Sequence, residues 1–255
     1  VVDRPPLGHW PPADPAALGY VHEDFAAHVF PRGVVKALGA FLSGARYVKR
    51  LTASVTEIDV AASSLLLADG GRVGFGHVIV SAGIGAFPLL QPLLAPEGKP
   101  LGRPVKGQAA LLVLDCDPAW PVIFDNGLYV VAHQGGHVAI GSTTEDDFDD
   151  PFGADHQIDG LIEMARKIVP ALADAPVVER WAGLRPRGVH REPMIGATED
   201  YPAVIALGGG FKTSFGIAHR LAGHAVRLAA GQPVEVLPDI YDLSIYRRRA
   251  HGEKR

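Results

Sequence analysis

The sequence has only one cysteine, Cys116, among its 255 residues. A single thiol cannot form an intrachain disulfide, so a disulfide framework is excluded and a reducing cytoplasm is the expected compartment. A lone thiol can be a nucleophile or a buried residue at the end of a strand. Because Cys116 follows the apolar run 109–114, the buried alternative is favoured.

Long hydrophobic runs and an excess of basic charge are also missing. The longest uncharged stretch, 78–96, is broken by Pro88, Pro92 and Pro96, which argues against a membrane span. The first fifteen residues are rich in proline and have no apolar core, so no secretory signal is predicted. A net charge of -4 argues against a nucleic-acid partner. The basic residues at 247–249 and 254–255 are interpreted as a frayed, solvated end.

Several catalytic and metal-binding motifs are absent. No serine lies in a GxSxG motif, and the eleven histidines form no HExxH motif. The acidic run 145–150 lacks the spacing and the central glycine of a calcium loop. The sequence therefore predicts neither hydrolase chemistry nor a metal site.

The hydrophobic pattern predicts two kinds of sheet. Helices are expected over 31–44, 158–169 and 216–230, with one helical turn over 86–90. Strands are expected over 18–22, 28–30, 47–49, 54–59, 63–68, 76–81, 106–114, 128–132, 137–141, 177–184 and 203–207. A strand that enters a glycine loop and a helix belongs to a parallel α/β layer, whereas the central hairpins indicate an antiparallel sheet. The predicted class is α/β plus α+β, with an incomplete Rossmann-like layer beside a large, mostly antiparallel sheet.

The glycine loop 208–214 is the first candidate site. It leaves a strand and enters a helix, where free backbone N–H groups and the helix dipole favour an anion. Lys212 adds a positive charge, but the loop is neither a GxGxxG motif nor a P-loop. From the loop alone, a glycine turn that packs strand on helix and a ligand site are equally good interpretations.

Arg185 and Tyr129 are the other candidates. Arg185 precedes Pro186 at the end of a predicted strand, a position that suits bidentate capture of a carboxylate, although a structural ion pair explains it equally well. Tyr129 alternates with apolar neighbours on a hairpin and could offer its phenol to a substrate, or simply pack.

Four stretches, in order along the chain, resemble the FAD-dependent D-amino-acid oxidase superfamily, in the style of glycine oxidase and sarcosine oxidase. They are 48–83, 104–108 together with 127–145, 183–196, and 208–231. The resemblance covers nearly the whole chain from about Gly19. Its specificity comes from the ordered set and not from any single motif.

The resemblance implies an FAD domain interrupted by a substrate domain. By position, the FAD domain would take 32–94 and 195–236, the substrate domain 1–31 and 95–194, and a C-terminal tail 237–255. FAD would be held without a covalent bond. The implied cofactor contacts are Val55 by the adenosine, then Ser81, Ala82 and Gly83 by the pyrophosphate and ribitol, and Gly209, Gly210, Phe211, Thr213 and Ser214 along the pyrimidine edge.

The resemblance also implies the catalytic-site residues. Arg185 matches the family's carboxylate-binding arginine, Tyr129 matches its partner tyrosine, and Lys212 stands where glycine oxidase has a substrate-side arginine. His219 replaces a frequent proline, and His190 a frequent aspartate. The family's first βαβ unit, with its GxGxxG motif, is absent. Either the sequence begins inside a longer protein, or the protein is a degenerate relative.

The predicted function is FAD-dependent oxidation of a small amine or amino acid by hydride transfer to the flavin, with the carboxylate held by Arg185. The alternative is a truncated or non-catalytic remnant of this family that acts as a binding or assembly subunit. Substrate identity, stereochemistry, the electron acceptor and homo-oligomerisation stay open.

Overall fold

The computed structural model describes residues 1–14, 17–25, 27–189 and 191–252. The chain divides into two compact units: unit 1 takes residues 1–50 and 106–183, and unit 2 takes residues 51–105 and 184–255. The first helix therefore falls in unit 1, whereas the sequence-based division placed it with the FAD domain. The assignment of a cofactor domain and a substrate domain stays a prediction.

Unit 1 is built on an antiparallel hairpin system. The five-stranded sheet has the order β6-β7-β8-β5-β9, and β7 pairs antiparallel with both β6 and β8. The inward-facing residues of β5, β7 and β8 form one core with Trp10 and with the apolar face of α3. The strands of this sheet are β5 (Gly102–Val113), β6 (Ile123–Asp125), β7 (Leu128–His133), β8 (His137–Gly141) and β9 (Val177–Gly188), and α3 spans Gln157–Ile168. By the bounds of the units, residues 102–105 of β5 and 184–188 of β9 belong to unit 2.

The helix α1 (Pro31–Ser43) also belongs to unit 1 and has no buried residue. Its apolar positions recur at helical spacing, as the sequence predicted, but they are exposed: Phe41 is 73% exposed and Val35 is 62% exposed. Its first turn is held by Arg32, which makes two hydrogen bonds with Glu179 at 2.6 and 2.7 Å and lies 4.8 Å from the centroid of the Trp181 ring.

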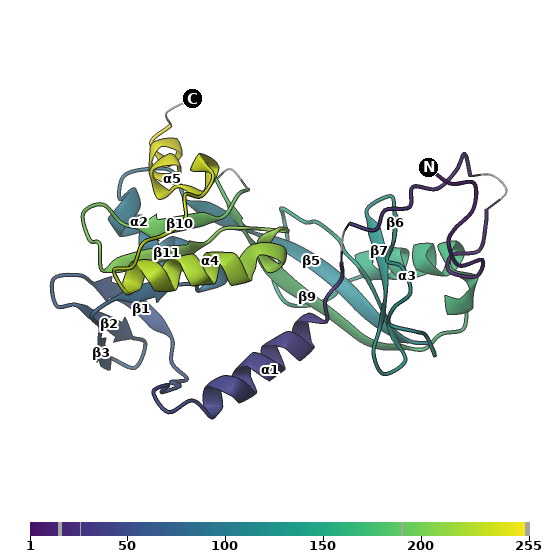
Figure 1. Cartoon of the computed structure of the whole chain (residues 1–255), viewed down its shortest axis with the longest axis horizontal. Helices are drawn as coiled ribbons and strands as arrows, with labels where there is room; N and C mark the ends of the chain where they lie inside the picture. The colour runs from purple at the N-terminus through teal and green to yellow at the C-terminus, as the bar shows by residue number, and fades with distance from the viewer. Residues whose placement is uncertain (15–16, 26, 190, 253–255) are drawn as a thin grey trace. The chain divides into compact units, whose positions relative to one another are not determined.

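The described residues of unit 2 form two small sheets and three α-helices, whose ribbons Figure 1 labels. One sheet, of order β10-β11-β4, contains the parallel pair β11 and β4, and the other is the antiparallel meander β1-β2-β3. The strands are β1 (Val55–Asp59), β2 (Ser64–Leu67), β3 (Arg72–Gly74), β4 (Val78–Val80), β10 (Met194–Ala197) and β11 (Val204–Gly208), and the helices are α2 (Ala86–Leu94), α4 (Ser214–Ala229) and α5 (Leu243–Ala250).

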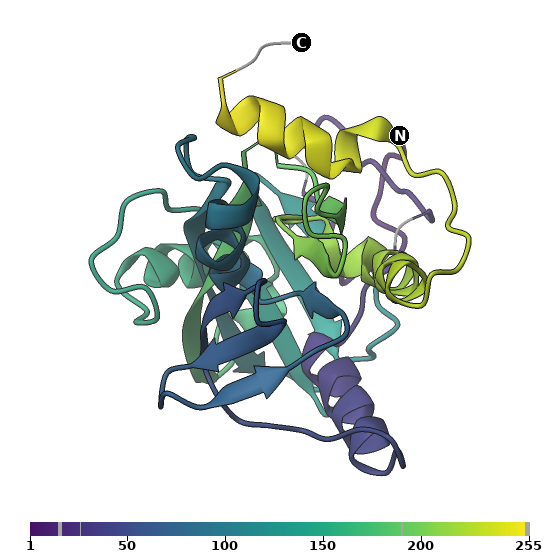
Figure 2. The same ribbon diagram turned by 90° about the vertical axis from the view of Figure 1, so that its left-hand side faces the viewer.

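The interpretation of residues 247–249 as a frayed end is wrong, whereas residues 254–255 of the same prediction lie outside the described residues. Residues 243–250 form α5, whose Leu243, Tyr246 and Ala250 recur at helical spacing and are buried in the core of unit 2. Asp242 caps the helix by accepting a hydrogen bond from the Ser244 N–H at 2.7 Å. The views in Figures 1 and 2 show α5, in yellow, beside β10.

Most other predicted elements are confirmed within a few residues. The strands predicted over 18–22, 28–30 and 47–49 from short apolar runs are wrong, because none of these segments forms a strand in the structure. Three short strands (β3, β6 and β10) and α5 were not predicted. Within the described ranges, no helix is both long and apolar enough to cross a membrane.

Candidate cofactor and substrate site

The parallel strands β11 and β4 bring two predicted loops to one edge of their sheet. Val204 lies opposite Val78, and Ala206 lies opposite Val80. The carboxyl ends of both strands therefore lie side by side, and β4 continues into residues 81–83 while β11 continues into the glycine loop. In α/β proteins, ligands bind outside this edge.

The glycines in these loops serve two different purposes. Gly83 has a φ of +59°, and a Cβ added there would meet nothing within 4 Å, so its backbone is open to a ligand. Gly209 has a φ of +75°, and a Cβ there would lie only 2.7 Å from the Tyr246 hydroxyl oxygen. A Cβ at Gly210 would overlap the Ser214 hydroxyl. Packing against the chain itself therefore requires glycine at 209 and 210, whereas Gly83 offers the open cradle.

The end of β9 is joined to the glycine loop by backbone hydrogen bonds. The Phe211 N–H donates to the Pro186 carbonyl at 3.1 Å, and the Gly188 N–H donates to the Gly209 carbonyl at 3.2 Å. Arg185 lies within β9 and not after its end, so the predicted strand boundary at Leu184 is wrong. Pro186 fits in this strand because β9 is the edge of its sheet.

Arg187 and Lys212 lie close to the Phe211 ring, and the charges of further arginines act on Lys212. Arg185 and Arg187 share one face of β9, because side chains alternate along a strand. The Arg187 guanidinium carbon lies 5.8 Å from the centroid of the Phe211 ring, and the Lys212 ammonium lies 5.6 Å from it. Burial, followed by the charges of Arg185 and Arg191, lowers the pKa of Lys212. A group of like charges of this kind is stabilised by an anionic ligand.

The start of α4 adds to this positive field. Thr213 donates both its N–H and its hydroxyl to the Gly210 carbonyl, at 3.0 and 2.9 Å. The hydroxyl is thus used in the turn and does not cap the helix. The helix dipole contributes about half a positive charge at this end. Its direction favours a negatively charged group next to the glycine loop.

The structure brings most of the predicted site residues together, but not all of them. Ser81–Gly83, Gly209–Ser214, Arg185 and Lys212 all belong to unit 2. Val55 begins β1, whose Ile58 packs in the same core as Val80. Tyr129 belongs to unit 1, where it is 50% exposed and its ring lies 4.6 Å from that of Phe124. The predicted roles of Val55 and Tyr129 stay predictions.

Three residues of this region were given no role by the sequence analysis. Arg187 could have been found, because a residue two positions after Arg185 on a strand shares its face. Arg191 and Tyr246 carry no such signal. Arg191 lies in an irregular loop, and Tyr246 lies in α5, 54 residues after Glu192, whose carbonyl it contacts. His190 lies outside the described residues.

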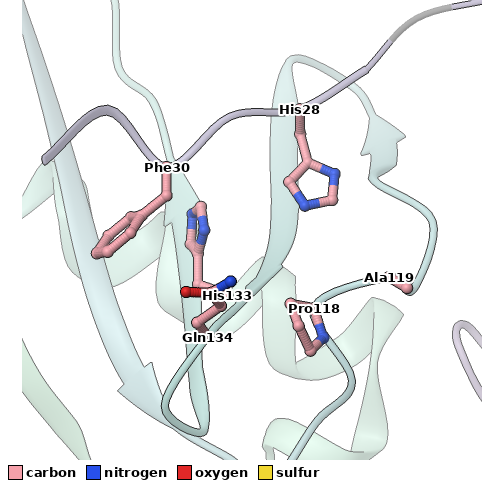
Figure 3. A pocket seen from close by; sticks show the side chains of 6 residues that line it. All are labelled: His28, Phe30, Pro118, Ala119, His133 and Gln134. Carbon is pink, nitrogen blue, oxygen red and sulfur yellow. The ribbon is translucent and has the colours of Figure 1, made fainter. Parts of the chain in front are cut away.

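Two hollows lie within unit 1. The first, of about 340 Å³, is lined by His28, Phe30, His133 and their neighbours (Figure 3). The His133 ring is 6.1 Å from that of His28 and 5.3 Å from that of Phe30, measured between centroids. Burial, followed by the charges of His28 and His137, lowers the pKa of His133.

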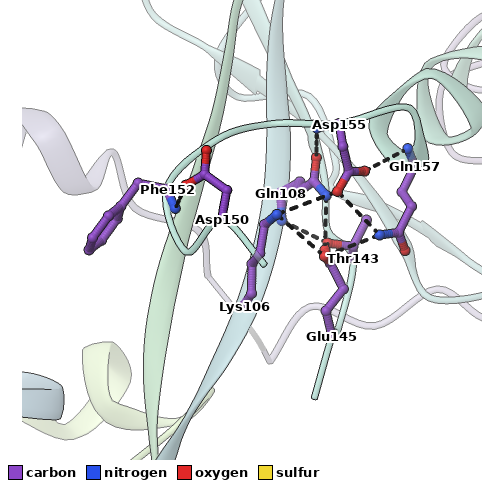
Figure 4. Close-up of polar contacts among 8 residues, drawn as sticks. All are labelled: Lys106, Gln108, Thr143, Glu145, Asp150, Phe152, Asp155 and Gln157. Carbon is purple, nitrogen blue, oxygen red and sulfur yellow. Dashed lines mark hydrogen bonds and ion pairs between the residues drawn. The ribbon is translucent and has the colours of Figure 1, made fainter. Parts of the chain in front are cut away.

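The second hollow, of about 420 Å³, surrounds a buried lysine (Figure 4). Lys106 is 2% exposed, and its ammonium lies 3.6 Å from a Glu145 oxygen and 3.4 Å from an Asp155 oxygen. Gln108 donates to Glu145 at 3.1 Å and accepts from the Asp155 N–H at 2.8 Å. Hydrogen bonds from Gln108 and from the Gln157 N–H lower the pKa of Asp155 to about 2. This connected network ties β5 to the segment after β8. In the part of the chain that the structure describes, no three potential ligand side chains are placed to hold a metal ion.

A parallel strand pair that leads into glycine loops and a cluster of cations is the arrangement of α/β proteins that bind nucleotide cofactors. Comparison with known proteins narrows this class. The family described as FAD dependent oxidoreductase, DAO, matches residues 4–223. The chain belongs to this family of flavin-dependent oxidoreductases.

The chain is also similar to individual members. It is 31% identical to the glycine oxidase of Pseudomonas aeruginosa over 149 residues, which is 58% of this chain and 40% of that protein. It is 23% identical to the glycine oxidase of Bacillus licheniformis over 234 residues, which is 88% of this chain and 60% of that protein. The chain thus spans less than two thirds of these relatives.

Solved structures agree on the fold. The iminodiacetate oxidase of Chelativorans sp. BNC1 superposes with a TM-score of 0.66 at 24% identity, covering 76% of this chain and 53% of that one. The glycine oxidase of Geobacillus kaustophilus superposes with a TM-score of 0.64 at 21% identity, covering 74% of this chain and 51% of that one. These likenesses confirm the predicted fold class, and the family confirms FAD as the cofactor.

Proposed function

We propose that this chain forms part of an enzyme that oxidises an amine or amino acid at the carbon next to nitrogen. When bound, FAD supplies the chemistry by accepting the hydride, and the protein supplies position and electrostatics. The observation that carries the proposal is the group of cations, Arg185, Arg187 and Lys212, at the edge where β4 and β11 enter their loops.

The loops of unit 2 have the shape and charge to hold an anionic cofactor. Gly83 leaves its backbone open, so the adjoining Ser81 and Ala82 would approach the ribitol and pyrophosphate. The glycine loop, the start of α4 and Lys212 would line the pyrimidine edge of the flavin, where negative charge develops on reduction. Val55 would lie by the adenosine.

Arg185 is proposed to anchor the substrate carboxylate. Its planar guanidinium can bind both carboxylate oxygens, and the hydrogen bonds at Pro186 and Gly188, directly after it in β9, fix its strand to the glycine loop. The reactive amine can bind in its neutral form, so no side chain is needed as a general base to remove a proton from it. The glycine oxidases among the relatives support a small amino acid as substrate.

This sequence contains no GxGxxG motif to hold the pyrophosphate together with residues 81–83. The relatives are longer than the matched regions, and we propose that a strand, a GxGxxG motif and a helix complete the site in the whole protein. The alternative function is a binding or assembly subunit without bound flavin. It requires that the whole protein has no strand, GxGxxG motif and helix of this kind.

The first experiment separates these two functions. FAD is titrated into the 255-residue chain and into the complete gene product, with calorimetry and the flavin absorption spectrum as readouts. The 255-residue chain should bind weakly, because each missing charge-assisted phosphate contact is worth ~1.5–3 kcal/mol. The complete product should purify yellow. A complete gene product without a GxGxxG unit, and without flavin, would establish the alternative.

The second experiment tests the carboxylate anchor. In the complete enzyme, Arg185→Met should lower kcat/KM for a carboxylate-bearing amine by roughly 30- to 4,000-fold, the equivalent of ~2–5 kcal/mol. The decarboxylated amine should be affected little. Arg185→Lys should restore only part of the loss, and Arg220→Met, at an exposed arginine of α4, serves as the control. If Arg185→Met lowers both substrates equally, the arginine is structural.

A further inference from the structure

Tyr246 lies where three segments of the candidate site meet. It is fully buried although it carries a hydroxyl, and that hydroxyl donates a hydrogen bond to the backbone carbonyl of Glu192. Burial raises the pKa of the phenol, so it stays protonated and able to donate. Glu192 lies in the loop that leads into β10.

The same hydroxyl rests against two glycines. A Cβ at Gly188 would overlap it, and a Cβ at Gly209 would lie 2.7 Å from it. Gly188 ends β9, the strand that carries Arg185 and Arg187, and Gly209 lies in the loop that leads to Lys212. The Gly188 N–H also donates to the Gly209 carbonyl, so the phenol fills the space beside a direct backbone contact. Any side chain at either glycine would displace the tyrosine.

The helix that supplies Tyr246 is held independently of this contact. Asp242 caps its first turn, and the Lys99 N–H donates to the Ala250 carbonyl at 2.8 Å in its last turn. On its outer side, Arg247 pairs with Glu199 at 3.1 Å and with Asp200 at 3.5 Å. The position of the phenol is therefore set at both ends of α5.

We infer that Tyr246 is a positioning residue that fixes the spacing between the arginines of β9 and the glycine loop, and so sets the geometry of the anion site. It touches neither substrate nor cofactor in this scheme and acts through Gly188, Gly209 and Glu192. The inference rests on the proposed function for its kinetic consequence, but its structural consequence can be measured without that function.

The structural test measures the titration of Lys212 in the 255-residue chain. The lysines are methylated with a ¹³C label, and Lys212→Arg identifies the signal. In Tyr246→Phe, the Lys212 pKa should shift upward toward the ordinary lysine value, because the loosened site buries the ammonium less and no longer holds the Arg185 charge close to it. Tyr201→Phe, at an exposed tyrosine, should leave it unchanged. An unchanged Lys212 titration in a folded Tyr246→Phe protein overturns the inference.

A double-mutant cycle tests the contact itself. Gly188→Ala should lower the melting temperature sharply, because its methyl group overlaps the Tyr246 hydroxyl. Tyr246→Leu should also lower the melting temperature, because it leaves a void. Because the new methyl group occupies part of that void, the double variant should lose less than the sum of the two single losses. Additive losses would show that the two residues do not act on each other and would contradict the inference.

The kinetic test uses the complete FAD-loaded enzyme. Tyr246→Phe should raise KM for a carboxylate-bearing substrate by roughly tenfold to a hundredfold, with little change for the decarboxylated amine. Equal losses for both substrates would show that Tyr246 serves stability alone. If the wild-type enzyme oxidises no amine, the proposed function fails, and the Lys212 titration still decides the role of Tyr246.

Discussion

Val80 and Ala206 lie opposite each other on neighbouring parallel strands, with Val80 directly before residues 81–83 and Ala206 two residues before the glycine loop. This register brings residues 81–83 to the same edge as the glycine loop, although about 125 residues separate them in the sequence. The cofactor loops can therefore be tested as a pair.

Gly83→Ala should weaken FAD binding in the complete enzyme more than it weakens the fold. The added methyl group meets nothing within 4 Å, so the folding cost is the strain of a positive φ, about 1 kcal/mol. If FAD lies against this backbone, the methyl group also excludes it. Gly85→Ala is the matched control, because its Cβ would make only an ordinary contact at 3.6 Å. Equal FAD affinities for the two variants would remove Gly83 from the cofactor site.

Lys106→Met should destabilise the chain by ~3–5 kcal/mol, because it leaves the buried Glu145 without its counter-charge. The double variant Lys106→Met/Glu145→Gln should recover part of that loss. Denaturant unfolding measures both. A Lys106→Met chain as stable as wild type would mean that water or other groups already satisfy Glu145.

Acid should weaken the same network at Asp155. Its pKa is lowered to about 2 in the fold, below the ordinary value of 3.8. Its contribution to the free energy of unfolding is therefore present above about pH 4 and is lost as the pH falls toward 2. Asp155→Asn should flatten the pH dependence of unfolding in that window. The same slope in both proteins would show that Asp155 does not contribute.

His133 should make unfolding pH-dependent in a second window. Its pKa is lowered in the fold, so the unfolded chain binds a proton first as the pH falls below about 6.5, and stability falls with it. His133→Phe keeps a ring against Phe30 and should remove this dependence. His22→Phe, at an exposed histidine, is the control. Identical pH profiles for wild type and His133→Phe would refute the assignment.

Cys116 should be neither catalytic nor attached to flavin. Burial raises the pKa of its thiol, and its sulfur lies 3.4 Å from the His137 carbonyl oxygen, so it is a protonated structural group at neutral pH. Cys116→Ala should keep FAD binding and turnover, and the thiol should react slowly with iodoacetamide. A flavin adduct on Cys116 in a mass spectrum would overturn this prediction.

The sequence predicted those parts of the site that lie on regular, locally readable elements. The strand, glycine loop and helix of residues 204–229 follow from an apolar run, a glycine cluster and a helical pattern, and each is confirmed. Arg185 was found by its proline neighbour, although the strand continues past it to Gly188. Local pattern was enough where the chain packs against its immediate neighbours.

Long-range packing was not predictable in the same way. The residues 247–249 resemble a solvated basic tail, yet Leu243, Tyr246 and Ala250 on the other face of that helix are buried. No local pattern shows that a phenol will fit between Gly188 and Gly209, because the contact joins residues far apart in the sequence. In α1 the opposite occurs: an apolar helical face was predicted, and the described chain leaves it exposed.

The three tryptophans offer a way to observe the two units separately. Trp10, in the unit 1 core, stacks near Trp120 with 5.0 Å between centroids, and Trp181 lies under Arg32, so all three belong to unit 1. Intrinsic tryptophan fluorescence will therefore report the melting of unit 1 and remain silent on unit 2. A fluorescence transition that precedes or follows the loss of helical circular dichroism would show that the units unfold independently, and one shared midpoint would show that they unfold together.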